Sequence, residues 1–503
     1  MALAPERRAN GYRRLDGLVT EVHGAVEVSL VSVSPERLRA MVSASGWARL
    51  DAALQAGRAG LRGRTVWMVN STAVGGGVAE LLRASLPYFL GAGLDVRWTV
   101  IQAPPAFFTV TKRIHNLLHG HPGDGGELGE QERGVYEASL AANAISLRRR
   151  VRAGDIVVLH DPQTAGLAPA LKACGASVVL RSHVGADQAN ALVRTAWNFL
   201  RPYTAEADAV VFTRRSSVPP WLGAARVAVI PPCIDPCATK NLAMDDATVR
   251  AILTCAGLAG QQQGDMGRPA FRRRDGSSGH VGRRCLVVRA GRPARLGVDP
   301  LVVNLTRWDR LKDPVGVMES FTSGVLDRVD ARLILAGPPI DAVADDPDAA
   351  AVYGEVERRW RLLPSAARAR IDLARLPMCD LEENAAVVNA LQRQATVIAK
   401  KSLEEGFGLG VTEAMWKRRP VVASRVGGHQ DQIEDGINGV LVDDPGDLAS
   451  FGRATADLLR NPARAKRLGD AARQRVSERF LPDRYLARWA ELLATLPPAR
   501  APA

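Results

Sequence analysis

The pattern of apolar and polar residues predicts strands that alternate with helices. Short runs rich in valine, isoleucine and leucine recur along the chain, and several are apolar throughout, which is typical of parallel strands covered on both faces. Between them lie segments with apolar residues at helical spacing, such as residues 77–90. This alternation predicts βαβ units and two doubly wound parallel sheets. The predicted strands form two series, residues 65–70, 96–101, 155–160, 177–183, 209–213 and 227–232, and then 301–306, 331–337, 395–402, 420–425 and 439–442.

The two series of strands are separated by a stretch of different composition. Residues 261–298 are polar and rich in glycine and arginine, and they end just before the second series begins. We therefore expect an α/β domain over residues 1–298, with a basic insertion at about 255–298, and a second α/β domain over residues 299–478. In the remaining segment, 479–503, an apolar pattern predicts a last helix at 483–496 and a frayed end at 497–503.

The positive charge of the chain is unevenly distributed. The formal net charge is +13, and residues 271–295 alone hold eight arginines against one aspartate. A nucleic-acid site is one interpretation of such a patch. However, the pattern indicates a hairpin around residues 275–279, and no row of aromatic residues is interleaved with the arginines to stack on bases. A solvated basic insertion is therefore favoured, and we expect no nucleic-acid partner.

Composition restricts the remaining classes of protein. No apolar run approaches the roughly 20 residues of a membrane span, and residues 1–17 lack the apolar core of a secretion signal, so we expect a cytoplasmic protein with no membrane partner. The six cysteines are scattered, and the spaced pair Cys233 and Cys237 has no second pair of ligands nearby, which favours structural thiols over zinc. Asp346 and Asp348 resemble an acidic metal motif, but a helix N-cap explains them better. We expect no metal.

The clearest sign of chemistry is residues 401–419, which follow a predicted buried strand. Glu405 and Glu413 stand eight residues apart, with Gly406, Gly408 and Gly410 between them. A glycine-rich turn that leads into a helix presents free backbone N–H groups and a positive dipole end, which suit a phosphate. Carboxylates would repel that phosphate, so they should bind neighbouring hydroxyl groups. The pattern therefore indicates an anionic ester flanked by sugars, as in a nucleotide sugar.

Two more loops follow predicted strands. The first runs from Asn70 into a run of glycines that includes Gly76 and Gly77, and glycine lets a backbone approach a ligand closely, although a tight strand–helix turn would explain it too. The second carries Arg307 and Lys312, which could converge on a diphosphate or lie in a solvated loop. Because open α/β sheets bind ligands at the carboxyl ends of their strands, both loops are candidate binding segments.

Two histidines end strands of the first series. His160 is followed by Asp161, and His183 stands two residues after Arg181. A single histidine at a strand end is more often structural. Two at strand ends that should lie close together in one sheet favour a functional pair.

The residues around these loops resemble a known family. KSLEEGFGLGVTEAMW is similar to the glutamate-x7-glutamate region of the retaining glycosyltransferases of family 4. VWMVNSTAVGGGVAELL, FFTVTKRIHNLLHG, HDPQTAGL and VGGHQDQI narrow the resemblance to the trehalose glycosyltransferring synthases within that family, over most of residues 60–480. Two features depart from that pattern: the stretch 255–298 is longer, and RSHVGAD replaces an RCHID-like segment. Both departures concern the acceptor more than the type of reaction.

The resemblance implies the GT-B fold, in which two Rossmann-like domains face each other across a cleft and a last helix crosses back to the first domain. It implies a retaining transferase that moves glucose from a nucleoside diphosphate glucose to glucose, forms α,α-trehalose and needs no cofactor or metal. Glu405 would contact the transferred glucose, and Glu413 would hold the ribose. The implied donor-binding residues are Gly76, Gly77, Arg307, Lys312, Gly406, Phe407, Gly408 and Glu413; the acceptor-binding residues are Asn70, Asp161, Arg181 and His183; and the catalytic residues are Glu405, His183, Asp161, Arg307 and Lys312.

Other functions stay open at this point. A trehalose phosphorylase shares much of the pattern but would leave Glu413 without a ribose to hold. A family 4 transferase with another acceptor and a non-catalytic sensor of nucleotide sugars are further alternatives. A nicotinamide dehydrogenase is disfavoured, because the glycines near Gly76 lack the G-x-G-x-x-G spacing. The base of the donor, the direction of the reaction and a homodimeric assembly are not decided by the sequence.

Overall fold

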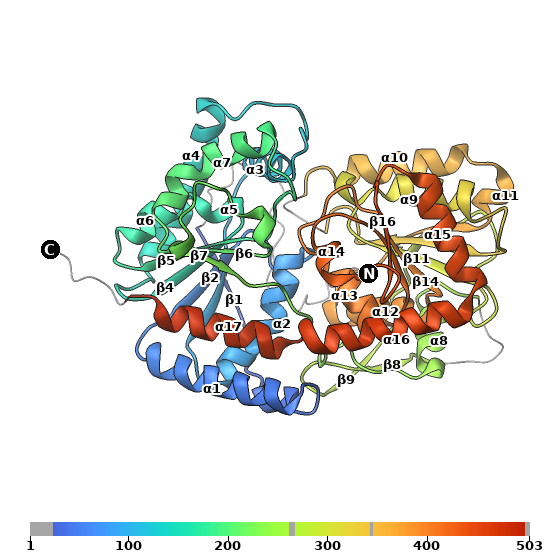
Figure 1. The fold of residues 1–503 in the computed structure, drawn as a ribbon, viewed down its shortest axis with the longest axis horizontal. Helices are drawn as coiled ribbons and strands as arrows, with labels where there is room; N and C mark the ends of the chain where they lie inside the picture. Colours follow the sequence, from blue (N-terminus) through green and yellow to red (C-terminus); the bar gives the residue numbers. More distant parts are fainter. Residues whose placement is uncertain (1–23, 261–266, 343–345, 498–503) are drawn as a thin grey trace, which may run out of the picture.

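The computed structural model describes residues 24–260, 267–342 and 346–497 and contains two seven-stranded sheets, one in each of two lobes (Figure 1). The first sheet has the order β1-β3-β2-β4-β5-β6-β7, in which only β1 is antiparallel to its neighbour. Its strands are β1 (Val26–Val28), β2 (Val66–Asn70), β3 (Val96–Val100), β4 (Ile156–His160), β5 (Ser177–Ser182), β6 (Ala209–Phe212) and β7 (Val227–Val229).

The second sheet repeats this plan. Its order is β10-β13-β12-β11-β14-β15-β16, and only β10 is antiparallel to its neighbour. The chain therefore has the GT-B architecture of two doubly wound α/β domains, as predicted. The strands are β10 (Leu286–Val288), β11 (Leu301–Leu305), β12 (Arg332–Gly337), β13 (Ile371–Arg375), β14 (Val397–Lys400), β15 (Val421–Ser424) and β16 (Val440–Val442).

Helices cover both faces of each sheet, so every domain has a core on either side of its strands. Along β2, Trp67 and Val69 enter one core while Val66 and Met68 enter the other, as the alternation of a strand requires. The helices of the first part of the chain are α1 (Ala44–Gly60), α2 (Gly77–Gly91), α3 (Pro105–Leu118), α4 (Glu130–Arg148), α5 (Pro162–Ala165), α6 (Ala168–Lys172), α7 (Ala191–Ala205) and α8 (Asp246–Cys255). Those of the second part are α9 (Pro314–Gly324), α10 (Ala349–Leu362), α11 (Ser365–Arg368), α12 (Leu381–Gln394), α13 (Leu409–Trp416), α14 (Gly428–Gln432), α15 (Leu448–Arg460), α16 (Pro462–Arg479) and α17 (Pro482–Thr495).

All eleven strands predicted for the two sheets are present, and the sheets contain three further strands, within the described residues, that were not predicted. Two of these, β1 and β10, are three-residue edge strands with exposed side chains. The third, β13, lies inside the sheet but contains Asp372, whose carboxylate is buried against Arg289 at 2.8 Å and Arg332 at 3.5 Å. A search for apolar runs does not find this strand, because it contains a charged residue. The ion pairs that allow the carboxylate to be buried come from residues distant in the sequence.

The basic insertion forms the predicted hairpin, from β8 (Ala270–Arg272) and β9 (Ser278–His280). The insertion belongs to the second domain, although the expected boundary at residue 298 assigned it to the first. Strand β10 pairs with β13 at the edge of the second sheet, and Ile234 and Val249 already belong to the core under that sheet. Cys233 and Cys237 still belong to the core of the first domain, so by these contacts the chain passes to the second domain between Ile234 and Val249. Residues 1–23 and 498–503 lie outside the described part, so the expectations about a leader and a frayed end are untested there.

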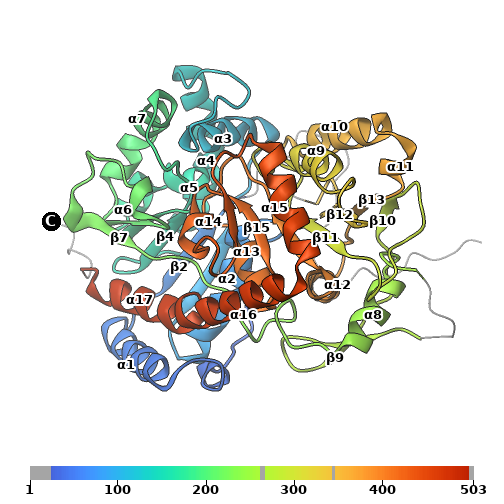
Figure 2. The ribbon, with the colours of Figure 1, turned by 45° about the vertical axis from the view of Figure 1, so that its right-hand side comes forward.

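The chain returns to the first domain through α16 and α17, which run along one side of both lobes (Figure 1). Helix α17 packs against α1, and its apolar face enters the core that also holds Leu50 and Leu82. The turned view shows α17 beside α1 again (Figure 2). The two segments that connect the domains contact each other: the backbone N–H of Ile234 donates to the carbonyl of Phe480 at 3.0 Å. Within the described residues, the helices are all too short or too polar to cross a bilayer.

Candidate active site

A cleft of about 350 Å³ lies where the carboxyl ends of the two parallel sheets meet. Asn70 and His160 reach it from the ends of β2 and β4, and Lys400 reaches it from the end of β14. Residues that stand far apart in the sequence are thus brought to one cavity, as open α/β sheets require. Of the residues singled out from the sequence, the following line it: Asn70, Gly76, Gly77, Asp161, His183, Arg307, Lys312, Glu405, Gly406, Phe407, Gly408 and Glu413.

Arg181 is the exception, and its expected contact with the acceptor is wrong. It lies inside β5, is 1% exposed and does not line the cleft. Its Nη2 donates to Thr213 Oγ1 at 3.2 Å and to the carbonyl of Ile230 at 2.6 Å. Burial lowers the pKa of the guanidinium to about 10. Arg181 therefore ties the ends of three neighbouring strands together beneath the cleft.

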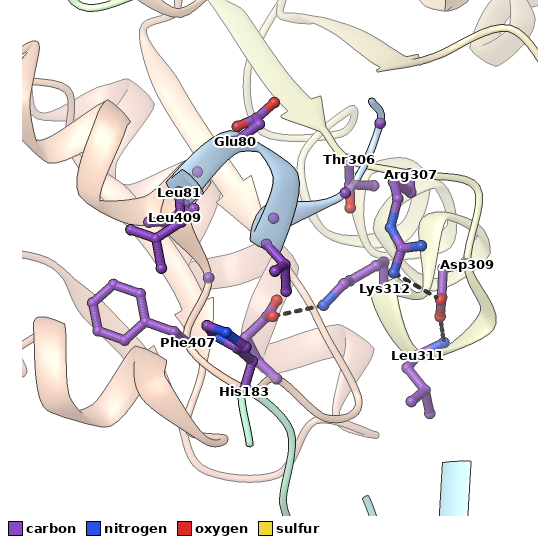
Figure 3. A pocket seen from close by; sticks show the side chains of 18 of the residues that line it. Glu80, Leu81, His183, Thr306, Arg307, Asp309, Leu311, Lys312, Phe407 and Leu409 are labelled. Carbon is purple, nitrogen blue, oxygen red and sulfur yellow. Dashed lines mark hydrogen bonds and ion pairs between the residues drawn. The ribbon is translucent and has the colours of Figure 1, made fainter. Parts of the chain in front are cut away.

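Glu405 is held as an anion at the centre of the cleft. Burial favours its neutral form, but Lys312, whose Nζ lies 2.6 Å from Oε1, outweighs burial and holds the pKa of Glu405 at about 2 (Figure 3). The other oxygen, Oε2, lies 3.4 Å from the hydroxyl of Ser402 and 3.8 Å from His429 Nε2. Burial lowers the pKa of His429 to about 4, so this imidazole is neutral near pH 7.

The backbone after Glu405 touches the first domain directly. A Cβ added at Gly406 would lie 2.4 Å from the carbonyl oxygen of His183, so only glycine fits there. Gly408 has φ 87°, the left-handed region, and begins α13. The glycines of this motif thus set the contact between the two domains and aim the amino end of α13 at the cleft.

Arg307 belongs to a group of four charges that joins the domains. Its Nη1 lies 2.9 Å from Asp346 Oδ2. Its Nη2 lies 3.6 Å from Asp309 Oδ2 (Figure 3). Lys112, on α3 of the first domain, reaches the same two carboxylates at 3.0 and 2.7 Å. Asp346 is therefore an ion-pair partner and not a capping residue as expected; Asp348 is the residue that precedes α10, and its side chain makes no capping hydrogen bond.

Glu413 sits in a second group of charges that also spans the domains. Its Oε2 accepts from Gln392 Nε2 at 3.2 Å, and its Oε1 lies 3.3 Å from Nζ of Lys240. The same ammonium lies 2.7 Å from Glu80, in the first turn of α2. Burial opposes ionisation of Glu413, but Lys240 and Lys417 hold its pKa below the ordinary value. A carboxylate has about four acceptor sites, so Glu413 can still accept from a ligand hydroxyl.

The two histidines predicted to pair do so. His160 Nδ1 lies 2.9 Å from His183 Nε2, and their rings are stacked at 5.2 Å. Burial lowers the pKa of His160 to about 3 and that of His183 well below its ordinary value, so both rings are neutral near pH 7. Asp161 accepts from the backbone N–H of His183 at 2.7 Å and has φ 62°, a strained conformation for a residue with a side chain.

Three residues around the cleft were not predicted from the sequence: Lys112, Lys240 and Gln392. None of them follows a predicted strand or stands in a glycine-rich loop; Lys112 and Gln392 lie within helices. A signal was present for Lys112, which lies in the FFTVTKRIHNLLHG segment already used for the resemblance. The described residues contain no group of three or more His, Cys, Asp or Glu that could hold a metal ion.

Comparisons with known proteins find relatives over most of the chain. Residues 68–219 match the family described as the N-terminal domain of trehalose synthase, and residues 298–475 match the glycosyl transferases group 1. Trehalose synthase of Rubrobacter xylanophilus is 33% identical over 442 residues, covering 87% of this chain and 91% of that protein. Trehalose phosphorylase of Pleurotus pulmonarius is 26% identical over 437 residues, covering 81% of this chain and 54% of that protein. The fold matches the crystal structure of a UDP-forming α,α-trehalose-phosphate synthase from Burkholderia vietnamiensis with a TM-score of 0.61, 17% identity and coverage of 86% of this chain and 98% of that one.

Proposed function

The chain belongs to the trehalose synthase family of GT-B glycosyltransferases, and on that premise we propose that it transfers glucose from a nucleoside diphosphate glucose to free glucose, with retention, to form α,α-trehalose. The observation that carries the proposal is the placement of Glu413. It is an ionised, 5% exposed carboxylate at the wall of the cleft, with acceptor sites left for hydroxyl groups. A nucleotide donor brings a ribose that uses such a group, and a donor without a nucleoside does not.

The positive groups of the cleft suit a departing diphosphate. Lys312 and Arg307 line the cavity beside the amino end of α13 and the loop with Gly76. We propose that they and the free backbone N–H groups stabilise the negative charge that develops on the leaving group. An ammonium has three donors, so Lys312 can contact Glu405 and a phosphate oxygen together. These fixed cations take the place of a divalent metal in the proposal.

The remaining polar groups suit the sugars. In the proposed reaction the acceptor hydroxyl attacks the anomeric carbon on the face that the diphosphate leaves, so the C–O bond to phosphate breaks as the new glycosidic bond forms and the configuration is retained. The hydroxyl proton passes to the leaving phosphate oxygen. Glu405 borders the transferred glucose, while neutral His183, held by Asp161 through its backbone N–H, orients sugar hydroxyl groups. Asn70, which lines the same cleft, is placed on the acceptor side.

The test is to supply the protein with glucose and, separately, ADP-glucose, UDP-glucose, GDP-glucose or glucose 1-phosphate, and to identify any disaccharide. We expect α,α-trehalose from at least one nucleotide sugar and the nucleoside diphosphate in equal amount. Trehalose formed only from glucose 1-phosphate would replace the proposal by a phosphorylase, the activity named for the Pleurotus relative. Release of nucleoside diphosphate without trehalose, and only with another sugar present, would keep the transferase and change the acceptor.

A further inference from the structure

A second cavity lies on the other side of the junction between the domains. Its volume is about 880 Å³, within the range of sites for small molecules. It is lined by the loop after β6, the segment after β7, α14, the end of α16 and the start of α17. The chain borders it just before its first passage between the domains, at Pro231–Cys233, and again at its second passage, at Phe480–Leu481.

The lining of this hinge cavity is strongly basic. Six arginines face two carboxylates, and no lysine is among the lining residues. The arginines come from both domains and from the crossing helix, and they are Arg214, Arg215, Arg475, Arg479, Arg484 and Arg488. Like charges gathered in a concave surface focus a positive potential and raise the local concentration of anions.

Carboxylates pair with two of these six arginines, Arg214 and Arg475, and, within the described part of the chain, leave the other four without a counter-charge. Asp431 is already held by Arg214 at 2.6 Å, and Glu478 accepts from Gln474 at 2.9 Å. Among the residues that the structure describes, Arg215, Arg479, Arg484 and Arg488 form no ion pair with a carboxylate. The cavity therefore holds guanidinium groups whose planar donors are still available.

Arg475 is only weakly neutralised. Its Nη1 lies 3.4 Å from Glu434 and its Nη2 donates to the carbonyl of Asp431 at 3.0 Å, but its Nε is buried and has no hydrogen-bond partner. Its side chain is 18% exposed and lines the cavity, and a single ion pair at 3.4 Å leaves part of its donor capacity unused. The guanidinium fork matches phosphate oxygens two at a time, which a lysine cannot do.

We propose that the hinge cavity binds a small metabolite that carries a phosphate dianion. Arg479 on α16 and Arg484 on α17 would bind it, with Arg215 contributing from the first domain. Because these residues belong to parts that move relative to each other when two domains open or close, the bound anion would favour the arrangement of the two domains in which these arginines line one cavity. Thr213 and Pro232 line both this cavity and the active-site cleft, so the two sites share a wall.

Binding of inorganic pyrophosphate to the full chain, measured by calorimetry, tests the site. We expect two sites per chain. Arg479→Gln/Arg484→Gln should weaken the hinge site at least about tenfold, since it removes two charge-assisted hydrogen-bond donors. Arg467→Gln, an exposed residue of the same helix that does not line the cavity, should change neither site. Both arginines are exposed, so we expect the double variant to fold normally, and an unchanged melting temperature checks this.

The outcomes separate this site from the active site. Lys312→Ala should remove the other pyrophosphate site and leave the hinge site intact. A single site that is lost in Lys312→Ala, or equal binding by the double variant and the Arg467→Gln control, would overturn the proposal. A single site that is lost only in the double variant would keep it and count against the proposed function. ATP and glucose 6-phosphate, used as further probes, distinguish a nucleotide from a sugar phosphate as the source of the anion.

The effect on the active site is the second readout, and this part rests on the proposed function. With a nucleotide sugar at limiting concentration, a saturating phosphate ester that binds the hinge cavity should lower the donor KM of the wild type and of Arg467→Gln. It should not lower that of Arg479→Gln/Arg484→Gln. An equal change in all three proteins would show that the anion acts elsewhere and would refute the coupling between the sites.

Discussion

Replacing Lys240 by methionine tests the charge group around Glu413. The change keeps an apolar stem of similar length and removes the ammonium that lies between Glu413 and Glu80. Glu413 is 5% exposed, and only the Gln392 amide would remain as a side-chain donor to it. Leaving a buried charge without its partner costs roughly 3–5 kcal/mol. Because Lys240 is itself partly exposed and Gln392 stays in place, we expect the lower end, about 3 kcal/mol, in the free energy of unfolding near pH 7.

Glu80→Gln is the matched control for this change. It removes the other carboxylate of the group, whose side chain is 47% exposed, so it should cost about 1 kcal/mol or less. The measurement is denaturant unfolding of the wild type and the two variants. If both variants cost the same, Lys240 would be only a surface ion-pair partner, and the argument from burial would fail.

The dependence on pH gives a second check of the same argument. In the wild type the pKa of Glu413 is lowered, so its ion pair contributes stability above the ordinary pKa of a glutamate, and this contribution is lost as the pH falls. In Lys240→Met only Lys417 remains to oppose burial, so the pKa of Glu413 should rise and protonation in acid relieves the weakly compensated charge. The difference between wild type and variant should therefore shrink from about pH 7 to about pH 5. A constant difference would refute the reasoning.

Four further predictions concern the proposed reaction. Chelators should leave activity largely intact, and complete loss that magnesium or manganese restores would contradict the role given to fixed cations. Glu413→Gln should mainly raise the donor KM and Glu405→Gln should mainly lower kcat, because ribose contacts are similar in ground and transition states; one shared kinetic pattern would refute the separate roles. Arg307→Ala should lower kcat by on the order of 10²–10³, the scale of one lost transition-state donor, and near-normal turnover would make it a structural residue. Burial lowers the pKa of Lys400, which lines the cleft, to about 8, so a bound nucleotide anion should raise it and cause proton uptake near pH 8.5; calorimetry in two buffers should detect this uptake in the wild type and not in Lys400→Gln.

The sequence predicted those parts of the site that are formed by a single continuous segment of the chain. The strand ends at Asn70 and His160 and the glycine turn between Glu405 and Glu413 are local patterns, and the structure brings them to one cleft. The cleft follows because parallel strands of both sheets end on the same side.

The charged partners of these residues could not be predicted from local sequence patterns. Lys112 reaches Asp309 across the domain boundary, and Lys240 joins Glu413 to Glu80 of the first domain; these separations in the chain are long, so no local spacing identifies the two lysines. Arg181 shows the opposite error. The family resemblance implied a contact with the acceptor, but the buried guanidinium donates to Thr213 and to the carbonyl of Ile230 beneath the cleft.

The packing of α17 on α1 has a consequence for how the protein is made. Tyr485, Trp489 and Leu493 complete a core whose other members, such as Leu50 and Leu82, lie in the first part of the chain. During synthesis, the second sheet can assemble before α17 has left the ribosome, whereas the first domain still lacks one wall of its core. The first domain to be translated is therefore the last to be finished, and the cleft between the domains cannot be complete before the last helix has docked.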